Sequence, residues 1–341
     1  MMRCLGLAAT AALCLVSPSA LAATGMSVNI DPTLADKYGL DAGGMEDALG
    51  GSIQEELHLG DASAFLGAMA DASALATKGM GVDYASNFEK FMVGMSLGSG
   101  VSAGGATFNK GGQELPDYGF SFQMAGTVGV NMGLLSGGEG FLSRIVLFGH
   151  GMTLNTSGDT FGGNLLNYGG HLQLRLIKPQ DAEVVAWGGL ALTGGYEYTA
   201  YRLDLQQGMP ITAPSSGLDM TWDATGDYVM KASSESFPVE VSTNLRVLVA
   251  TAFVGAGMDF NTGTATTAME LSGPIQADVM GESRVLGDAT VSTIHSGQAG
   301  PSFPRVFGGL QLNVFVLKVY GQVNIGLDEG FGGHAGVRVA L

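Results

Sequence analysis

The feature that most constrains this chain is a two-residue periodicity that lasts far longer than in an ordinary strand. From Tyr118 to Leu134, the even positions hold aromatic or aliphatic residues or glycine, whereas the odd positions hold small or polar residues. A period of two predicts a β-strand whose two faces meet different surroundings. The run exceeds the ~5–6 residues of a common globular strand. It suits a tilted strand that needs ~9–11 residues to cross a membrane and continues beyond it.

The same alternation returns along 164–177, 217–231, 236–249 and 317–327, which indicates many strands of one kind. We therefore expect an all-β fold, a transmembrane antiparallel β-barrel of about 12 strands within a range of roughly 10 to 14. A soluble β-sandwich also alternates, but the length and number of the runs and their small-residue face argue against it. The expected strands are 88–105, 117–134, 141–154, 164–177, 183–205, 217–231, 236–249, 251–263, one within 264–297, 303–315, 317–327 and 331–341.

The phase of the alternation reverses at several places. Apolar residues move from even to odd positions after Val316, and similar reversals fall near 249–251 and across 233–236. Because a shift of one residue moves every side chain to the other face, each reversal predicts a tight turn or a bulge.

Composition excludes several other classes of protein. The chain has 55 glycines among 341 residues, well above the usual ~7%, but they follow no three-residue repeat, so it is not a collagen. It is too apolar, at 46%, for a disordered chain. Acidic residues outnumber Lys and Arg by 31 to 15, for a net charge of −16, so we expect no nucleic-acid partner.

The first residues predict export. Met1–Arg3 are a short basic start, Cys4–Val16 are mostly apolar, and Ala20-Leu21-Ala22 resembles a cleavage site, so we expect a signal peptide at 1–22. Its removal would take away Cys4 and Cys14 and leave no disulfide or thiol. With no long apolar helix to follow, we expect a location in the cell outer membrane. The partners would be outer-membrane lipid and, during insertion, the barrel assembly machinery, because Val337, Val339 and Leu341 alternate at the end of the chain.

The region between the signal peptide and the barrel has a different pattern. Residues 23–87 lack sustained alternation, and apolar residues between Leu59 and Met80 suggest short helices. We expect three domains: 1–22, an N-terminal helical segment at 23–87, and a barrel at 88–341. The helical segment would either plug the lumen or form a periplasmic tail.

Polar residues on the small-residue faces of the strands are the candidate lining of the lumen. They are Gln123, Asn131, Asn167, His171, Gln173, Arg175, Asp219, Asp223, Asp227, Glu240, Asn244 and Arg246. The three aspartates share one strand face, and an open pore lined by them would favour cations. Positions four apart on a strand are separated by about 13 Å, so these aspartates do not form a calcium site by themselves.

No catalytic or metal-binding constellation stands out. The five histidines lack metal-ligand spacing, and the Gly-x-Ser-x-Gly matches at 94–98 and 100–104 lie on a continuous strand rather than at a strand-to-helix turn. We expect no enzyme activity, no metal and no cofactor.

The layout resembles the FadL-type outer-membrane transporters of hydrophobic compounds. The residues that carry the resemblance are the helical stretch 55–80 and the run from Phe237 to Arg246 with its following strand. The resemblance implies a barrel with a helical segment ahead of it and a hydrophobic cargo. That family has fourteen strands and an Asn-Pro-Ala start of its hatch, which Asn29-Ile30-Asp31-Pro32 does not match, so no binding residue is carried over.

Three functions follow as hypotheses. The first is passive passage or binding of a small molecule, hydrophobic ones included. The second is a structural or adhesive outer-membrane barrel with a closed lumen. The third is an outer-membrane lipid-modifying enzyme, for which no Ser, His and acid set is evident.

Overall fold

The protein is described from a computed structural model, which describes residues 23–57, 62–103, 118–182, 184–215, 218–279, 281–327 and 330–341. The expected signal peptide at 1–22, the stretch 58–61 within the resemblance and the connection 106–116 between the first two expected strands lie outside the described residues. Within them, none of the helices is both long and apolar enough to cross a membrane.

Strands dominate the described residues. The strands are β1 (Ala23–Ile30), β2 (Phe91–Ser102), β3 (Gly119–Asn131), β4 (Ile145–Ser157), β5 (Phe161–Ile177), β6 (Gln180–Asp181), β7 (Val185–Ser215), β8 (Leu218–Val247), β9 (Ala250–Val279), β10 (Glu282–Gln298), β11 (Ser302–Val314), β12 (Leu317–Gly326) and β13 (Gly330–Ala340). The helices are α1 (Pro32–Lys37), α2 (Ala42–Glu56), α3 (Ser63–Ala76) and the 3₁₀ turns η1 (Met132–Ser136) and η2 (Leu142–Arg144).

The expected β-barrel is confirmed, and its hydrogen-bonded ring contains ten strands. All neighbours are antiparallel, in the order β2-β3-β4-β5-β7-β8-β9-β11-β12-β13, and β13 closes the ring on β2. Its outer surface carries exposed apolar side chains such as Val93, Phe122 and Val241. Each strand of the ring pairs with two neighbours over at least part of its length, and an apolar outer belt is the surface that a transmembrane barrel presents to lipid.

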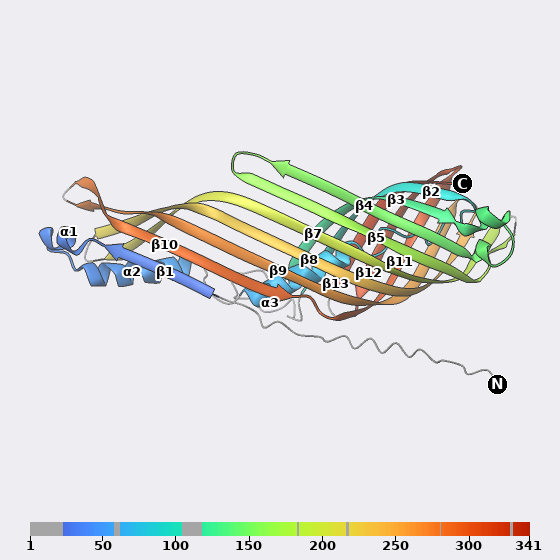
Figure 1. Ribbon diagram of the computed structural model, residues 1–341, viewed down its shortest axis with the longest axis horizontal. Helices are drawn as coiled ribbons and strands as arrows, with labels where there is room; N and C mark the ends of the chain where they lie inside the picture. The colour runs from blue at the N-terminus through green and yellow to red at the C-terminus, as the bar shows by residue number, and fades with distance from the viewer. Residues whose placement is uncertain are drawn as a thin grey trace, which may run out of the picture.

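Three strands run on past the ring and build a second region, the extension. It consists of β7 from 206, β8 up to 227, β9 from 264, and all of β10, β1, α1 and α2. β9 pairs with β11 over 250–260 and with β10 over 264–279, and β1 adds to the far edge of β10. The molecule is therefore elongated, with the ring at one end and the extension at the other (Figure 1). The opposite end of the ring, where η1, η2 and the turns at 248–249 and 315–316 lie, is called the turn end.

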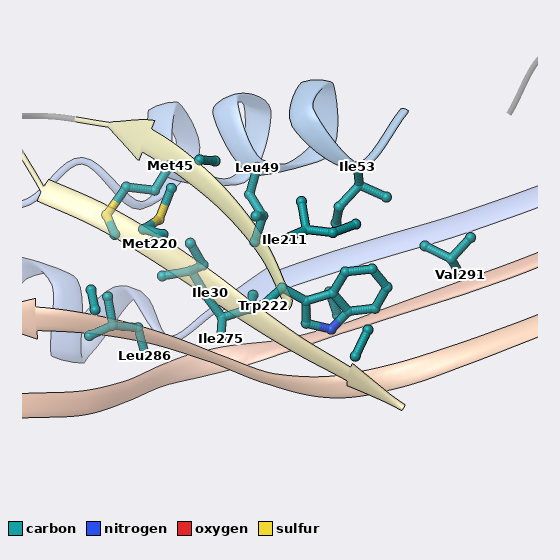
Figure 2. Close-up of a cluster of buried hydrophobic side chains, with 14 of the residues drawn as sticks. Ile30, Met45, Leu49, Ile53, Ile211, Met220, Trp222, Ile275, Leu286 and Val291 are labelled. Atoms are coloured by element: carbon teal, nitrogen blue, oxygen red, sulfur yellow. The ribbon is translucent and has the colours of Figure 1, made fainter. Parts of the chain in front are cut away.

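The extension has a hydrophobic core of its own. Met45, Leu49 and Ile53 recur every four residues along α2 and form its buried face. They pack against the strands of the extension, including Trp222, whose indole donates a hydrogen bond to Gly273 O at 3.1 Å (Figure 2). The remaining core residues labelled in the figure are Ile30, Ile211, Met220, Ile275, Leu286 and Val291. The curled sheet of the extension thus packs around a helix, with α2 against β7 and β1.

The ten strands of the ring lie at the lower limit of the expected range, whereas several strand boundaries differ from the sequence-based expectation. The expected strands 217–231 and 236–249 are one strand, β8. The expected strand 251–263 is the first part of β9, which continues without a break to Val279. Even positions of β8 stay buried or half-buried from Met220 to Asn244, so the reversal across 233–236 is not a turn or a bulge. It marks the level at which the surroundings of both faces change. The reversals at 249–251 and after Val316 are turns, as predicted.

Candidate functional site

Most of the candidate lining residues face the interior of the ring, where they are buried. These are Gln123, Asn131, Asn167, His171, Gln173, Arg175, Glu240 and Asn244. Their use as the lining of a passage stays a prediction, because the interior is occupied by another part of the chain.

The three aspartates predicted to share the lumen wall lie elsewhere, and this prediction is corrected. Asp219, Asp223 and Asp227 are on the outer face of the extension, exposed to solvent. The inner face at this level is apolar because it packs around α2, so the polar face must point outward. Asp223 accepts a hydrogen bond there from Gln276 at 3.0 Å. Arg246 is also exposed, close to the turn end of β8. The expected cation preference therefore loses its basis in an aspartate-lined pore.

The interior of the ring is occupied by residues 63–88, which we call the interior segment. It comprises α3 and the irregular chain that follows it, and almost all of its residues from Leu66 onward are buried or half-buried. Glycines on the inner wall allow α3 to approach. A Cβ on Gly100 would lie 2.4 Å from Ala72 O, and one on Gly119 would lie 2.2 Å from Ala68 O. The small-residue face of these strands is thus explained by the helix packed on it.

Lys78 binds the interior segment to the part of the ring wall formed by β7, β8 and β9. Its ammonium lies 2.9 Å from a Glu197 carboxylate oxygen and 3.8 Å from one of Asp259, and it also donates to Ser236 Oγ. Asn324 donates in turn to the Lys78 carbonyl at 3.2 Å. Lys78, Glu197 and Asp259 are all nearly inaccessible to solvent, and a buried charge is tolerated only when it is paired in this way.

Arg305 extends this ion-pair network. Its guanidinium binds Asp259 with Nε to Oδ2 at 2.7 Å, pairs with Glu240, and donates to Asn324 at 2.8 Å. The same Glu240 carboxylate accepts a hydrogen bond at 2.6 Å from the Tyr84 hydroxyl of the interior segment. The wall and the interior segment therefore share one connected set of charges.

A separate ion pair, outside this network, holds the interior segment at Asp83. Asp83 lies 2.9 Å from the Arg338 guanidinium and accepts hydrogen bonds from the backbone N–H groups of Ala85 and Ser86. The buried Asp83 carboxylate is thus paired with a cation, as a buried charge must be.

Three further polar candidates on the wall donate hydrogen bonds to main-chain carbonyls of the interior segment. Asn244 donates to Tyr84 O at 2.7 Å, and Arg175 and Asn131 both donate to Phe88 O, at 3.1 and 3.2 Å. Irregular backbone at membrane depth needs partners of this kind. These contacts, like the ion pairs, favour a lumen that is closed in this state.

His171 stacks on His150 with ring centroids 5.5 Å apart, and its Nε2 lies 3.6 Å from Glu197. The ring nitrogens of His150 have no hydrogen-bond partner among the described residues. In the part of the chain that the structure describes, no group of three or more His, Cys, Asp or Glu residues could hold a metal ion.

Sequence reasoning missed Lys78, Asp83, Tyr84, Glu197, Asp259 and Arg305. Glu197, Asp259 and Arg305 are single charges on the polar faces of alternating strands, and a single charge is a weak signal of an ion-pair network. Lys78, Asp83 and Tyr84 lie in a segment without periodicity, so only the tertiary structure shows their partners.

A gap in the ring wall separates β3 from β4 near the extension. The two strands pair only between 126–131 and 146–151, and among the described residues the rest of β3 pairs with no strand on that side. Side chains take over part of the missing pairing. Asn167 of β5 donates to Met124 O at 2.6 Å, and the Phe120 N–H donates to the Met69 sulfur at 3.3 Å. The free edge of β3 is therefore partly satisfied without a neighbouring strand.

An apolar cavity opens at this gap, and we call it the rim hollow. Its volume is about 450 Å³. Phe120 and Phe122 of β3 and Met69 of α3 form one side, and the inner face of β4, β5, β7 and β8 forms the other. The apolar residues on that other side are Leu154, Phe161, Leu165, Leu203 and Met230, with the ring of Tyr201. The Tyr201 hydroxyl is buried without a hydrogen-bond partner among the described residues.

A family model described as Lsa36-like matches residues 45–341. No curated protein matches the chain. Among solved structures, the chain is similar to the translocator domain of the autotransporter NalP from Neisseria meningitidis, at 11% identity and a TM-score of 0.31, covering 87% of this chain and 98% of that one.

Two further solved structures have lower scores. The transport unit of the autotransporter AIDA-I from Escherichia coli is 10% identical with a TM-score of 0.22, over 79% of this chain and 96% of that one. The Pseudomonas putida toluene transporter TodX is 8% identical with a TM-score of 0.22, over 77% and 95%. At this level the likenesses carry no argument about function. The ring has ten strands, where the FadL-type family has fourteen, so that resemblance stays a prediction.

Proposed function

The chain belongs to the Lsa36-like family, and from this premise and its geometry we propose that it is an outer-membrane β-barrel that binds a small apolar molecule in the rim hollow. The observation that carries the proposal is the hollow itself, an apolar cavity at a gap in the wall. The location in the outer membrane is supported by the apolar belt around a closed ring. The ligand class agrees with what the FadL-type resemblance implies.

The size and lining of the rim hollow suit such a ligand. Binding pockets for small molecules are commonly ~300–1,000 Å³ and mostly apolar with a few polar groups, and the hollow has a volume of about 450 Å³. Phe120 and Phe122 are 53% and 50% exposed, which gives a ligand an aromatic wall. The buried Tyr201 hydroxyl offers one unmet hydrogen bond. A fatty acid has this chemistry, whereas a monoaromatic hydrocarbon would use the apolar lining alone.

Gly163 provides a direct test, because it lines the rim hollow on the inner face of β5. A Cβ there would meet its neighbours at ordinary contact distances, the nearest being Arg202 O at 3.4 Å. Gly163→Leu therefore fills the hollow without straining the backbone. We expect it to weaken binding of a dansyl-labelled fatty acid at least ~10-fold, about 1.4 kcal/mol, as measured by fluorescence titration of the full chain in detergent.

Gly162→Leu is the matched control, because the neighbouring residue points to the other face of β5 and a Cβ there meets nothing closer than 3.7 Å. It should bind the probe like the unaltered protein. Equal probe affinity in the unaltered protein and the Gly163→Leu variant would rule out the rim hollow as the binding site. Competition by toluene and by an unlabelled fatty acid would then define the ligand class.

A second candidate function is a closed barrel that anchors the extension, with no flux through the lumen. The observation that favours it is the ion-pair network between the interior segment and the wall, centred on Lys78. Planar-bilayer recordings test it. Lys78→Met removes the central cation and should raise the frequency of conducting events if the interior segment is a displaceable gate. Silent recordings from both the unaltered protein and the variant would favour the anchoring function.

A further inference from the structure

The mouth of the ring at the turn end gathers positive charge around a cavity. This mouth, which we call the basic mouth, has a volume of about 440 Å³. Its lining includes the cations Arg175, Lys178, Arg246 and Lys318, and Glu89 is the single carboxylate among the residues that line it. Asparagine side chains, including Asn131 and Asn313, add neutral hydrogen-bonding groups. In a chain with a net charge of −16, a group of four cations around one cavity indicates an anionic partner.

The turn tips around the basic mouth are apolar and exposed, although their backbone conformation disfavours large side chains. Leu248 has φ of 54° and is 67% exposed, and Phe315 has φ of 55° and is 95% exposed. Glycine or asparagine fits this left-handed conformation easily, whereas a bulky residue does so at a cost. The turns would be more relaxed with the usual residues, so the local backbone does not explain a leucine and a phenylalanine there.

The apolar tips and the cations belong to one surface. Lys318 is three residues beyond Phe315 and its ammonium donates a hydrogen bond to Phe315 O at 2.6 Å. On the other side of the mouth, Leu135 of η1 and Phe141 of the η1–η2 connection are 74% and 65% exposed. The tips are also continuous with the apolar belt through Val314 and Leu317.

We propose that the basic mouth and its apolar tips form a binding site for the phosphate group of an anionic membrane lipid. The cations would hold the phosphate at the mouth, and Leu248 and Phe315 would lie against the acyl chains. Positive groups beside apolar side chains are the combination that holds a protein surface to anionic lipid. A free phosphate ion would use the cations but would leave the apolar tips without a role. The site lies at the opposite end of the ring from the rim hollow, so it does not depend on the function proposed above.

Binding of short-chain lipids to the full chain in detergent tests this site. The probes are dihexanoyl phosphatidylglycerol, dihexanoyl phosphatidylcholine and inorganic phosphate, each followed by native mass spectrometry and by the change in melting temperature. We expect the anionic lipid to bind at least ~10-fold more tightly than either of the other two. Equal binding of the two lipids would overturn the proposal, and phosphate binding as tightly as the anionic lipid would reduce the site to one for free anions.

Two sets of variants separate the charges from the tips. Lys178→Gln with Arg246→Gln should weaken binding of the anionic lipid at least ~10-fold, and Lys178→Arg with Arg246→Lys should keep it. Leu248→Asn with Phe315→Asn should also weaken it, while the melting temperature stays equal or rises because asparagine accepts the left-handed backbone. Arg284→Gln in the extension, where Arg284 pairs with Glu282, is the control. Unchanged lipid affinity in either the charge-neutral or the tip variant would overturn the proposal.

Discussion

Residues 236–247 and 218–227 belong to the same strand, β8, yet the two parts bury opposite kinds of side chain. In the ring, Ser236, Glu240 and Ser242 face inward and Val239 and Val241 face outward. In the extension, Met220 and Trp222 face inward and Asp223 faces outward. β9 changes in the same way, from outward Val254 to outward Glu270.

This contrast shows that a strand can pass from lipid into water without a turn. The register and the buried face are unchanged, and only the polarity of the two faces is exchanged. In the ring, the outside is lipid and the inside is a polar interior segment. In the extension, the outside is water and the inside is a helix with an apolar face. We expect the barrel to leave the membrane at the level of this exchange, near 228–235.

Removing its buried tryptophan should destabilise the extension far more than removing a half-buried tryptophan destabilises the ring. Trp222→Ala removes a fully buried indole from the core around α2 and should cost about 3–5 kcal/mol. Hydrogen exchange should show lost protection in α2 and β10 while the ring stays protected. Trp187→Ala, at a half-buried position of β7 near the turn end, is the control. Loss of protection throughout both regions would mean that they fold as one cooperative unit.

Ion pairs should matter in the ring and not on the extension. Asp259→Asn removes a buried partner of Arg305 and Lys78, and losing one partner of a buried pair should cost about 3 kcal/mol. Glu282→Gln breaks the Arg284 pair on β10 of the extension, whose side chains are 66% and 51% exposed, and should leave stability unchanged. The measurement is unfolding by urea in lipid vesicles, and similar losses in both variants would contradict the contrast.

An arginine substituted on the outer face of β8 should distinguish a position that contacts lipid from one that contacts water. At Val241, in the apolar belt, it should cost about 2–4 kcal/mol because the charge meets lipid. At Thr225, on the same face in the extension, it should change stability by less than about 0.5 kcal/mol. The same urea experiment reads both, and equal costs would place the membrane boundary elsewhere along the strand.

The smallest expected effect concerns the cap of α1. Asp31 accepts hydrogen bonds from the N–H groups of Thr33 at 2.9 Å and Leu34 at 3.3 Å. Asp31→Ala should cost about 1 kcal/mol, confined to the tip of the extension. Hydrogen exchange of 32–37 is the measurement, and a loss of protection that reaches α3 would show coupling between the tip and the interior segment.

The barrel was predictable from the sequence because a two-residue period is a local signal that repeats in each strand. The inward position of Gln123, Asn167 and Asn244 follows from the same alternation. The outward position of Asp219, Asp223 and Asp227 could not be predicted in this way, because alternation identifies residues that share a face without showing what that face contacts. The strand β1 was also missed, since it is a short edge strand whose partner, β10, lies far along the chain.

By itself, the sequence determined that this protein is a β-barrel with a wide apolar belt, because each strand must present alternate residues to two different solvents. Only the tertiary structure decided which part of each strand meets lipid and which meets water. It also decided that Lys78 meets Glu197 and Asp259 inside the ring. These contacts join residues more than a hundred positions apart, and no local pattern records them. They form because a charge buried in the ring must find a partner there.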